Sequence, residues 1–406
     1  MGEWKEIRLI DVLETLIDYR GKTPRKTTLG IPLITAKIIK NGRIETPSEF
    51  ISVDDYDSWM VRGFPKVGDV VLTTEAPLGE VAQLNDDNIA LAQRVVTLRG
   101  KSGILDNTYL KYFFLSRVGQ QRLKARETGT TVTGIKQSEL KEVLVDVPPY
   151  EVQVKIASIL SSLDDKIEVN RRINENLEQQ AQALFKSWFV DFEPFKECEF
   201  VESELGMIPK GWRVIELQDV VKIKRGGSPR PIQAFLSESG YKWLKISDAT
   251  ACKSPFLYDI KEHIKESGLS KTILLKPGSL VLSNSATPGI PKILGVESCV
   301  HDGWLYFPQS ELSKYYLYLL FIQNRNFLLS QGNGSVFTNL KTDILKTLKI
   351  VLPSKHLLWT FDKIIESLFI QIENKTKESR RLASLRDTLL PRLMSGEIRV
   401  DEINVL

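Results

Sequence analysis

The N-terminal half of this 406-residue chain is repeated in its C-terminal half. Four segments return in the same order about 200 residues later: WKEIRLIDV (4–12) as WRVIELQDV (212–220), KVGDVVLT (66–73) as KPGSLVLS (276–283), LDNTYLKYFF (105–114) as LSKYYLYLLF (312–321), and TGIKQSELKEVLVDVP (133–148) as TNLKTDILKTLKIVLP (338–353). This interval is too long for a solenoid repeat and matches a domain plus a connecting element. The chain is therefore a tandem duplication.

Each copy divides into a globular part and a helical part. In the globular part, short β-type runs such as DVVLTT and SLVLS alternate with turn signals and one helix-like stretch, which predicts a compact α+β domain. After Pro148-Pro149 and after Pro353, proline and glycine are missing for about 40 residues, and proline is tolerated at a helix entrance. We therefore expect one long helix at the end of each copy.

Both helices carry a heptad seam with apolar ends and a polar middle. The seam positions are Ile156, Leu160, Leu163, Ile167, Asn170, Asn174, Leu177, Ala181, Leu184 and Trp188, and Phe361, Ile365, Leu368, Ile372, Lys375, Ser379, Leu382, Arg386, Leu389 and Leu393. We expect the helices to pair antiparallel, with the polar middles helping to fix the register. Apolar residues outside the seam, among them Ile173, Phe185 and Ile364, exceed what a two-helix pair can cover. Either the globular domains or partner helices must pack on them.

These patterns predict an α+β fold in which two similar globular domains are separated by two long helices, paired as an antiparallel coiled coil in a pseudo-twofold tandem repeat. The expected segments are a first domain (1–147), a central helix (148–190), a linker (191–207), a second domain (208–352), a C-terminal helix (353–395) and a tail (396–406).

Composition predicts a cytoplasmic protein. The N-terminus has acidic residues where a secretion signal needs basic ones, and the longest apolar run, YYLYLLFI, is far too short to span a bilayer. Three widely spaced cysteines, Cys198, Cys252 and Cys299, indicate neither disulfides nor a metal knuckle. The net charge of +4 is too mild to indicate a nucleic-acid partner on its own.

No motif indicates an active site. DVPPY (146–150) is close to the D/N/S-P-P-Y/F/W motif of amino-group DNA methyltransferases, but Val147 stands where a polar residue must meet the target amine, and no glycine-rich cofactor loop precedes it. RGKTP (20–24) lacks the earlier glycine of a P-loop. The histidines His263, His301 and His356 lie too far apart to suggest a metal site or a triad.

A basic loop with glycine and proline follows the opening strand of each copy: YRGKTPRK (19–26) and KRGGSPR (224–230). Glycine lets backbone N–H groups approach a phosphate, and arginine can address guanine through two hydrogen bonds. A solvated surface turn is the alternative. The other loop tips differ between the copies, TTEAPLG against SNSATPG and AQR against HDG, although the surrounding frame is kept. Two domains that recognise different targets would show this difference, and so would random sequence drift between the copies.

The layout resembles the specificity subunit of type I restriction–modification enzymes. The similar features are the W-x-x-I/V-x-L-x-D/E-V/I domain openings, VGDVVLT and PGSLVLS, the I/L-K-x-x-x-L run into each helix, and LEQQAQALFKSWFVDFEPF (177–195). The resemblance implies that each globular part is a target recognition domain that reads one half of a split double-stranded DNA sequence. It also implies that the helices act as a spacer and dock two methyltransferase (M) subunits, which restriction (R) subunits join. Adenosylmethionine, ATP and magnesium would then belong to the partners, and this chain would hold no cofactor.

The resemblance and the loops together nominate two sets of residues. The candidate DNA-binding residues are Arg20, Lys22, Arg25, Lys26, Gln93, Arg94, Lys136, Lys224, Arg225, Arg230, Asn284, His301 and Lys341. The candidate partner-binding residues are Phe185, Trp188, Phe189, Phe192, Leu389 and Leu393. Two other functions remain open, an interaction scaffold that does not bind DNA and a stand-alone DNA methyltransferase or nuclease.

Overall fold

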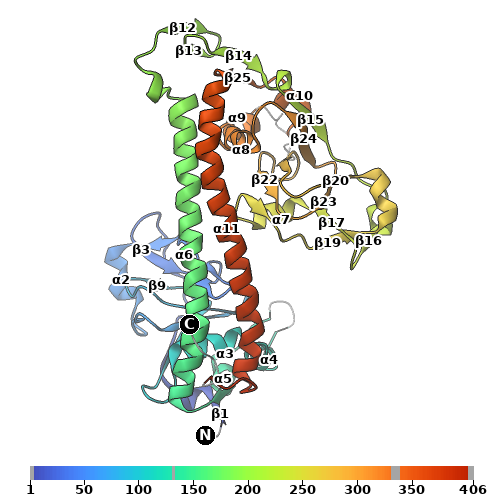
Figure 1. The fold of residues 1–406 in the computed structure, drawn as a ribbon. Coiled ribbons are helices and arrows are strands. Elements are labelled where there is room, and N and C mark those ends of the chain that lie inside the picture. Colours follow the sequence, from blue (N-terminus) through green and yellow to red (C-terminus); the bar gives the residue numbers. More distant parts are fainter. Residues whose placement is uncertain (1–3, 130–132, 331–338, 401–406) are drawn as a thin grey trace. The chain divides into compact units, whose positions relative to one another are not determined.

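The structure, a computed structural model, describes residues 4–129, 133–330 and 339–400 (Figure 1). Residues 401–406 of the expected tail lie outside the described residues. The chain forms two compact units, one made of Met1–Ile167 with Arg381–Leu406 and the other of Glu168–Arg380. Each unit contains one copy of the repeated globular part together with a portion of both long helices.

The globular part of the first unit, called domain 1, centres on an antiparallel sheet with the strand order β2-β10-β7-β8. Beside it lie the sheet β6-β3-β9 and the pairs β1-β11 and β4-β5. The strands are β1 (Lys5–Arg8), β2 (Leu13–Asp18), β3 (Ile31–Ile34), β4 (Ile39–Lys40), β5 (Arg43–Ile44), β6 (Phe50–Ile51), β7 (Val70–Thr74), β8 (Leu78–Gln83), β9 (Ala90–Leu91), β10 (Val95–Gly100) and β11 (Leu144–Val147). The helices are α1 (Leu9–Val12), α2 (Val53–Trp59), α3 (Asn107–Leu115), α4 (Arg117–Lys124) and α5 (Gln137–Lys141).

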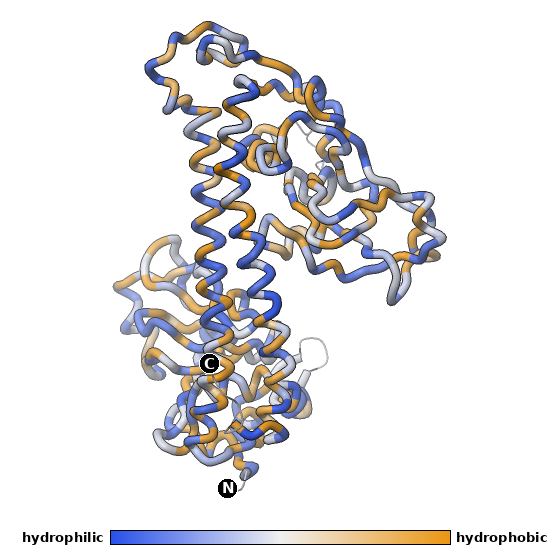
Figure 2. Tube along the Cα trace, in the orientation of Figure 1, coloured by the Kyte–Doolittle hydropathy of each residue, from blue (hydrophilic) through white to orange (hydrophobic). Residues whose placement is uncertain are grey.

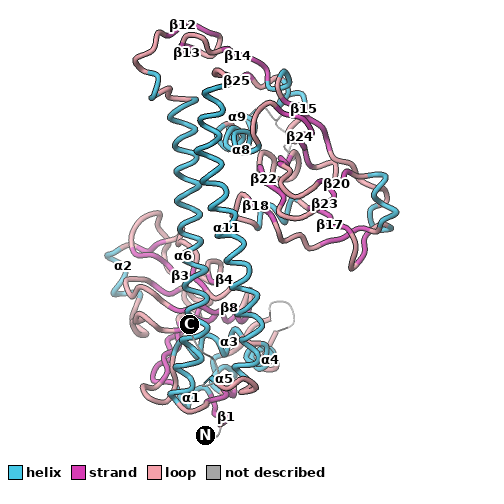
Figure 3. Tube along the Cα trace, viewed as in Figure 1, coloured by secondary structure: helices cyan, strands magenta, loops and turns pink. Residues whose placement is uncertain are grey.

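The globular part of the second unit, called domain 2, repeats this plan with the strand order β15-β24-β21-β22-β18, beside the sheet β16-β19-β17-β23-β20 and the pair β14-β25. Its strands are β14 (Arg213–Glu216), β15 (Val221–Arg225), β16 (Leu236–Ser237), β17 (Tyr241–Leu244), β18 (Phe256–Leu257), β19 (Glu262–Ile264), β20 (Ile273–Leu275), β21 (Leu280–Ser283), β22 (Pro291–Leu294), β23 (Ser298–Val300), β24 (Trp304–Ser310) and β25 (Lys349–Leu352). Its helices are α7 (Ile246–Ala251), α8 (Lys314–Gln323), α9 (Arg325–Ser330) and α10 (Thr342–Lys346), and a hairpin of β12 (Phe200–Ser203) and β13 (Gly206–Pro209) precedes it. Figure 3 shows the strands in magenta and the helices in cyan.

The repeated VVL run explains why the central strands are buried on both faces. Successive side chains of a strand point to opposite faces of a sheet. On β7, Val70 and Leu72 pack with the core beneath α3, whereas Val71 packs with the β6-β3-β9 sheet. On β21, Leu280 and Leu282 likewise pack in one core cluster and Val281 packs in another. Each central sheet is thus covered on both faces, and its strand ends carry the loops.

The two long helices, α6 (Tyr150–Phe189) and α11 (Lys355–Met394), pair antiparallel in each unit. In the first unit Asp164 accepts a 2.7 Å hydrogen bond from Arg386, and in the second unit Asn174 donates to Thr376 at 3.2 Å. Nearer the end of α6, the ring of Phe185 lies 6.1 Å from that of Phe361. The residue numbers of the partners on α11 therefore decrease as those on α6 increase. The antiparallel pairing is confirmed, and Figure 2 shows apolar and polar residues alternating along both helices.

The helices do not stand apart from the domains as the expected segment boundaries describe. Ile156, Leu160 and Leu393 belong to the core of domain 1, whereas Phe189 and Phe361 belong to the core of domain 2. The boundary between the compact units consequently crosses both helices, after Ile167 and after Arg380. The apolar residues outside the seam explain this difference, since they extend the domain cores onto the helices.

Candidate nucleic-acid interface

Four segments of domain 1 meet at one end of its central sheet, where β2, β7 and β10 have their loops. The backbone N–H of Thr74 donates to the carbonyl of Arg94 at 3.0 Å, and the N–H of Ile135 donates to the carbonyl of Thr74 at 2.9 Å. The Thr23 hydroxyl donates to Gln93 Oε1 at 2.9 Å. These bonds join residues 19–26, 74–77, 92–94 and 133–136, here called the domain 1 loop cluster.

Domain 2 repeats the cluster bond for bond. The N–H of Asn284 donates to the carbonyl of Gly303 at 2.9 Å, and the N–H of Leu340 donates to the carbonyl of Asn284 at 2.8 Å. The Ser228 hydroxyl donates to Asp302 Oδ1 at 2.6 Å, which ties the basic loop to the HDG loop. Residues 225–231, 284–287, 301–303 and 339–341 form the domain 2 loop cluster.

One turn of each cluster has the same unusual backbone. Thr73 Oγ1 donates to the carbonyl of Pro77 at 2.6 Å, and Ser283 Oγ donates to that of Thr287 at 2.7 Å. Inside these turns Ala76 has φ 48° and Ala286 has φ 57°, a left-handed conformation that costs energy for a residue other than glycine. The domains therefore preserve a strained loop frame while the side chains it presents differ.

The cations of the domain 1 cluster fall into two groups. Arg20 is held by Asp18, with Nε 2.8 Å from Oδ2, and it donates to the carbonyl of Ile135 at 2.6 Å. Lys26 and Arg94 form 2.8 Å ion pairs with Glu49 and Glu75, respectively. Lys22, Arg25 and Lys136 are exposed and have no hydrogen-bond or ion-pair partner for their side chains among the described residues. The last group is available to a ligand at no cost in broken bonds.

In domain 2 two of the four candidate cations contact Asp302. Arg225 donates to its carbonyl, and Arg230 Nη2 lies 3.3 Å from its Oδ2 while the Arg230 side chain stays 79% exposed. Hydrogen bonding from Ser228 lowers the pKa of Asp302, so it is ionised at neutral pH. Lys224 and Lys341 are exposed. In the strand register Arg225 lies opposite Leu305 of β24, and Asp18 lies opposite Val96 of the corresponding strand, β10. Arg225 therefore stands where domain 1 has Asp18. The two basic loops match in residue type but not position by position.

Asn284 does not fit the expectation that it contacts DNA. It is 3% exposed, and both its backbone groups and its Nδ2 are bonded within the loop cluster. Its Oδ1 is buried without a partner among the described residues. Because the side chain lies under the loops, we correct its role to that of a frame residue.

His301 is mostly buried, with a side chain 19% exposed. Its Nδ1 accepts a 2.8 Å hydrogen bond from the N–H of Gly303, which places the proton of the neutral ring on Nε2. Burial lowers the pKa of His301 below its ordinary value, and the nearby carboxylate of Asp302 opposes this only partly. At neutral pH the ring is therefore an uncharged hydrogen-bond donor.

The expected partner-binding residues are mostly used by the chain itself. Phe185 and Phe189 are buried in the core of domain 2, where the rings of Phe189 and Phe361 lie 4.6 Å apart, and Leu393 is buried in the core of domain 1. We correct the expectation for these three, because a buried side chain has no surface to offer. Trp188, Phe192 and Leu389 are partly exposed, and for them the role stays a prediction.

Other apolar side chains of the helices remain uncovered. Ile173 of α6 is 37% exposed, and on α11 Trp359 is 59%, Ile364 40% and Ile370 45% exposed. Ile173 and Ile364 already stand out in the sequence as surplus to the heptad seam. The sequence could not show which surplus residues the domains cover, since that depends on how the domains pack on the helices.

The sequence motifs with possible catalytic meaning serve the fold. Val147 of DVPPY is buried in the core, and the carboxylate of Asp146 forms a 2.9 Å ion pair with Arg122. Among the described residues, no group of three or more histidine, cysteine or acidic side chains could hold a metal ion. No described helix is long and apolar enough to cross a membrane.

Comparisons with known proteins agree with this organisation. The family model of the type I restriction modification DNA specificity domain matches residues 1–179 and 209–382, one match per repeat. The MjaIX specificity subunit of Methanocaldococcus jannaschii is 30% identical, over 99% of this chain and 95% of that protein, and the HindI specificity subunit of Haemophilus influenzae is 26% identical, over 98% and 100%. The crystal structure of a type I S subunit from M. genitalium has a similar fold, with TM-score 0.57 and 17% identity over 97% of this chain and 96% of that one. This chain belongs to the family of type I restriction–modification specificity subunits.

Proposed function

We propose that each domain reads one half of a two-part DNA target through its loop cluster. As a specificity subunit, the chain directs a restriction–modification complex to its DNA sequence and leaves catalysis to other subunits. The duplicated loop cluster is the observation that carries the proposal. A shared frame with different exposed side chains is what two readers of different half-sites require.

The charge distribution in the clusters supports contact with DNA. Lys22, Arg25 and Lys136 in domain 1, and Lys224 and Lys341 in domain 2, project from the loop frame where the acidic side chains are already paired. Phosphate contacts of this kind set orientation, and base-edge contacts give specificity. The modest net charge of +4 fits a subunit that shares phosphate contacts with partners.

The partners follow from the same proposal. Two M subunits dock on the helices, where apolar side chains such as Ile173, Ile364 and Ile370 are uncovered, and R subunits join through the complex. Adenosylmethionine, ATP and magnesium bind to those partners, and this chain binds no cofactor of its own. The chain acts in the cytoplasm, where the DNA is.

Expression of the chain with M subunits in a host that lacks this methylation tests the proposal. Sequencing of methylated bases should then show a two-part motif with an unread gap of fixed length. M subunits expressed alone are the control and should leave the motif unmodified. Assembly with M subunits but no sequence-dependent methylation or DNA retention would identify the chain as a scaffold and would contradict the proposal.

A further inference from the structure

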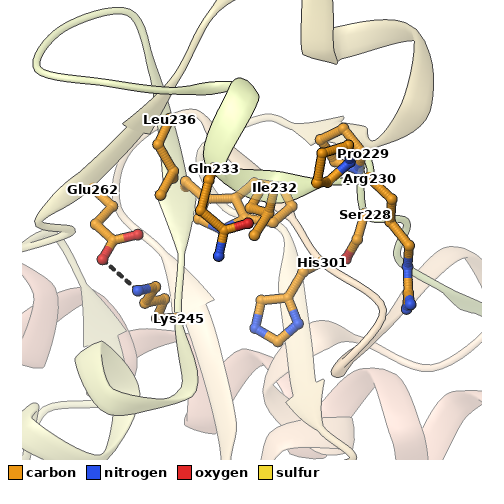
Figure 4. Close-up of a pocket in the computed structure, with 11 residues that line it drawn as sticks. Ser228, Pro229, Arg230, Ile232, Gln233, Leu236, Lys245, Glu262 and His301 are labelled. Atoms are coloured by element: carbon orange, nitrogen blue, oxygen red, sulfur yellow. Dashed lines mark hydrogen bonds and ion pairs between the residues drawn. The ribbon is translucent and has the colours of Figure 1, made fainter.

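Domain 2 contains a pocket of about 630 Å³ beside its loop cluster (Figure 4). The segment that follows the basic loop, including Ile232 and Gln233, forms one wall, and Trp243 of β17, Glu262 of β19 and His301 line the rest. This volume lies in the range of small-ligand sites. A loop surface that only follows the edges of stacked bases has no need of such a cavity.

The polar groups of the pocket form a mixed set of donors and acceptors. His301 presents an N–H on Nε2, because its Nδ1 is already bonded to Gly303. The amide of Gln233 is exposed and can both donate and accept. Glu262 is ion-paired with Lys245 through Oε1, and its Oε2 is buried and has no partner among the described residues. A nucleobase presents the complementary mixture along its edge.

The remaining walls are apolar, and the rim is basic. Ile232 and Leu236 supply surface against which the flat face of a base can be buried, and Trp243, which is only 3% exposed, lies behind them. Arg230, at the rim, is 79% exposed and can meet the phosphate that accompanies the base. An apolar interior, a hydrogen-bonding edge and a cation at the mouth suit a nucleotide better than a purely apolar ligand.

The same positions in domain 1 lack these side chains. On the paired strands, Leu33 opposite Ala90 corresponds to Trp243 opposite Cys299, so Ala92 takes the place of His301. Neither leucine nor alanine can donate a hydrogen bond. The arrangement of Trp243 and His301 is therefore particular to domain 2.

We propose that this pocket holds one unstacked nucleobase of the DNA that domain 2 reads. The inference rests on the proposed function, because the pocket meets DNA only if the loop cluster does. Enzymes that extrude a base read it by hydrogen bonds to its edge and by apolar packing on its face. Here capture of the base serves recognition rather than chemistry, since a specificity subunit leaves catalysis to other subunits of the complex.

The test uses the full chain assembled with M subunits and duplexes carrying 2-aminopurine, which brightens when it leaves the base stack. The label is moved one position at a time through the half-site of domain 2. We expect a several-fold rise at one position other than the base that becomes methylated. Gln233→Ala should diminish the rise, and Gln233→Trp, which fills the pocket mouth, should abolish it. Gln309→Ala and Gln309→Trp are matched controls at another exposed glutamine of domain 2, and they should leave it intact.

The outcomes separate this inference from the proposed function. If the wild-type complex does not distinguish cognate from scrambled DNA, the proposed function fails. If it does, but no position besides the methylated base brightens, or the Gln233 variants change nothing, the pocket does not hold a DNA base. Binding of free deoxynucleoside monophosphates that Gln233→Trp blocks, without any brightening in DNA, would assign the pocket to a free nucleotide and overturn the proposal.

Discussion

Inserting one heptad into each long helix should lengthen the unread gap of the DNA target. The compact units divide after Ile167 on α6 and after Arg380 on α11, so insertions at these two points leave each domain with its own helix contacts. Asp164 keeps Arg386 on one side, and Asn170 keeps its 3.1 Å bond to Glu378 on the other. A seven-residue insertion also preserves the seam register.

The expected change follows from helix geometry. Seven residues at about 1.5 Å each lengthen both helices by about 10 Å, which equals about three base pairs at about 3.4 Å. Three base pairs also rotate the far half-site by about 100°, at about 10.5 base pairs per turn. The inserted heptad adds little rotation to the helix pair, so the protein does not follow this rotation of the DNA. Methylation at the lengthened target should therefore be slower.

Sequencing of methylated sites in cells carrying the variant is the assay. Both half-sites should remain the same while the gap between them grows by about three base pairs. An insertion in α6 alone is the control, and it should destabilise the subunit because the seams no longer match. Full methylation with an unchanged gap would refute the idea that the helices set the distance.

Three further predictions concern single sites. Replacing Arg225 and Arg230 with alanine should weaken DNA binding and reduce the slope of log K against log salt by about one per phosphate contact. Arg213→Ala is the exposed control. An unchanged slope would mean that the loop is an ordinary surface turn. Phe189→Ala should lower the free energy of unfolding by about 3–5 kcal/mol, whereas Ile173→Ala should leave the isolated subunit nearly unchanged and weaken assembly with M subunits, as denaturation and co-purification would show. NMR titration should give His301 a pKa below 6.5, because burial lowers it. The contribution of this residue to stability is then full above pH 6.5 and is lost as the pH falls through the folded-state pKa. A pKa above 6.5 would contradict the lowering of the pKa by burial.

Much of the architecture could be predicted because it rests on periodic patterns. The heptad seams from Ile156 and Phe361, and the repeated VVL and LVL runs, each specify which face is buried, and the structure places them accordingly. The loop clusters could be predicted only as a set, because duplication shows which loops belong together. It does not show which side chains are free, and Arg20 and Arg25 look alike in the sequence although Asp18 holds only the first.

The partner residues show where sequence reasoning fails for a physical reason. Phe185 and Ile173 are both apolar and both outside the heptad seam, yet one is buried and the other exposed. Only the packing of domain 2 against α6 decides between them. Asn284 is a similar case, since a polar residue in a variable loop is expected at the surface, and here backbone hydrogen bonds draw it beneath the loops.

Exchange of one domain shows whether the two domains read their half-sites independently. Residues 13–146 are replaced by the matching segment of another family member, while both helices and domain 2 stay intact, and the methylated sites are then sequenced. We expect one half of the target to change to that of the donor, and the other half and the gap to be kept. A change in both halves, or in neither, would contradict independent reading by the two domains.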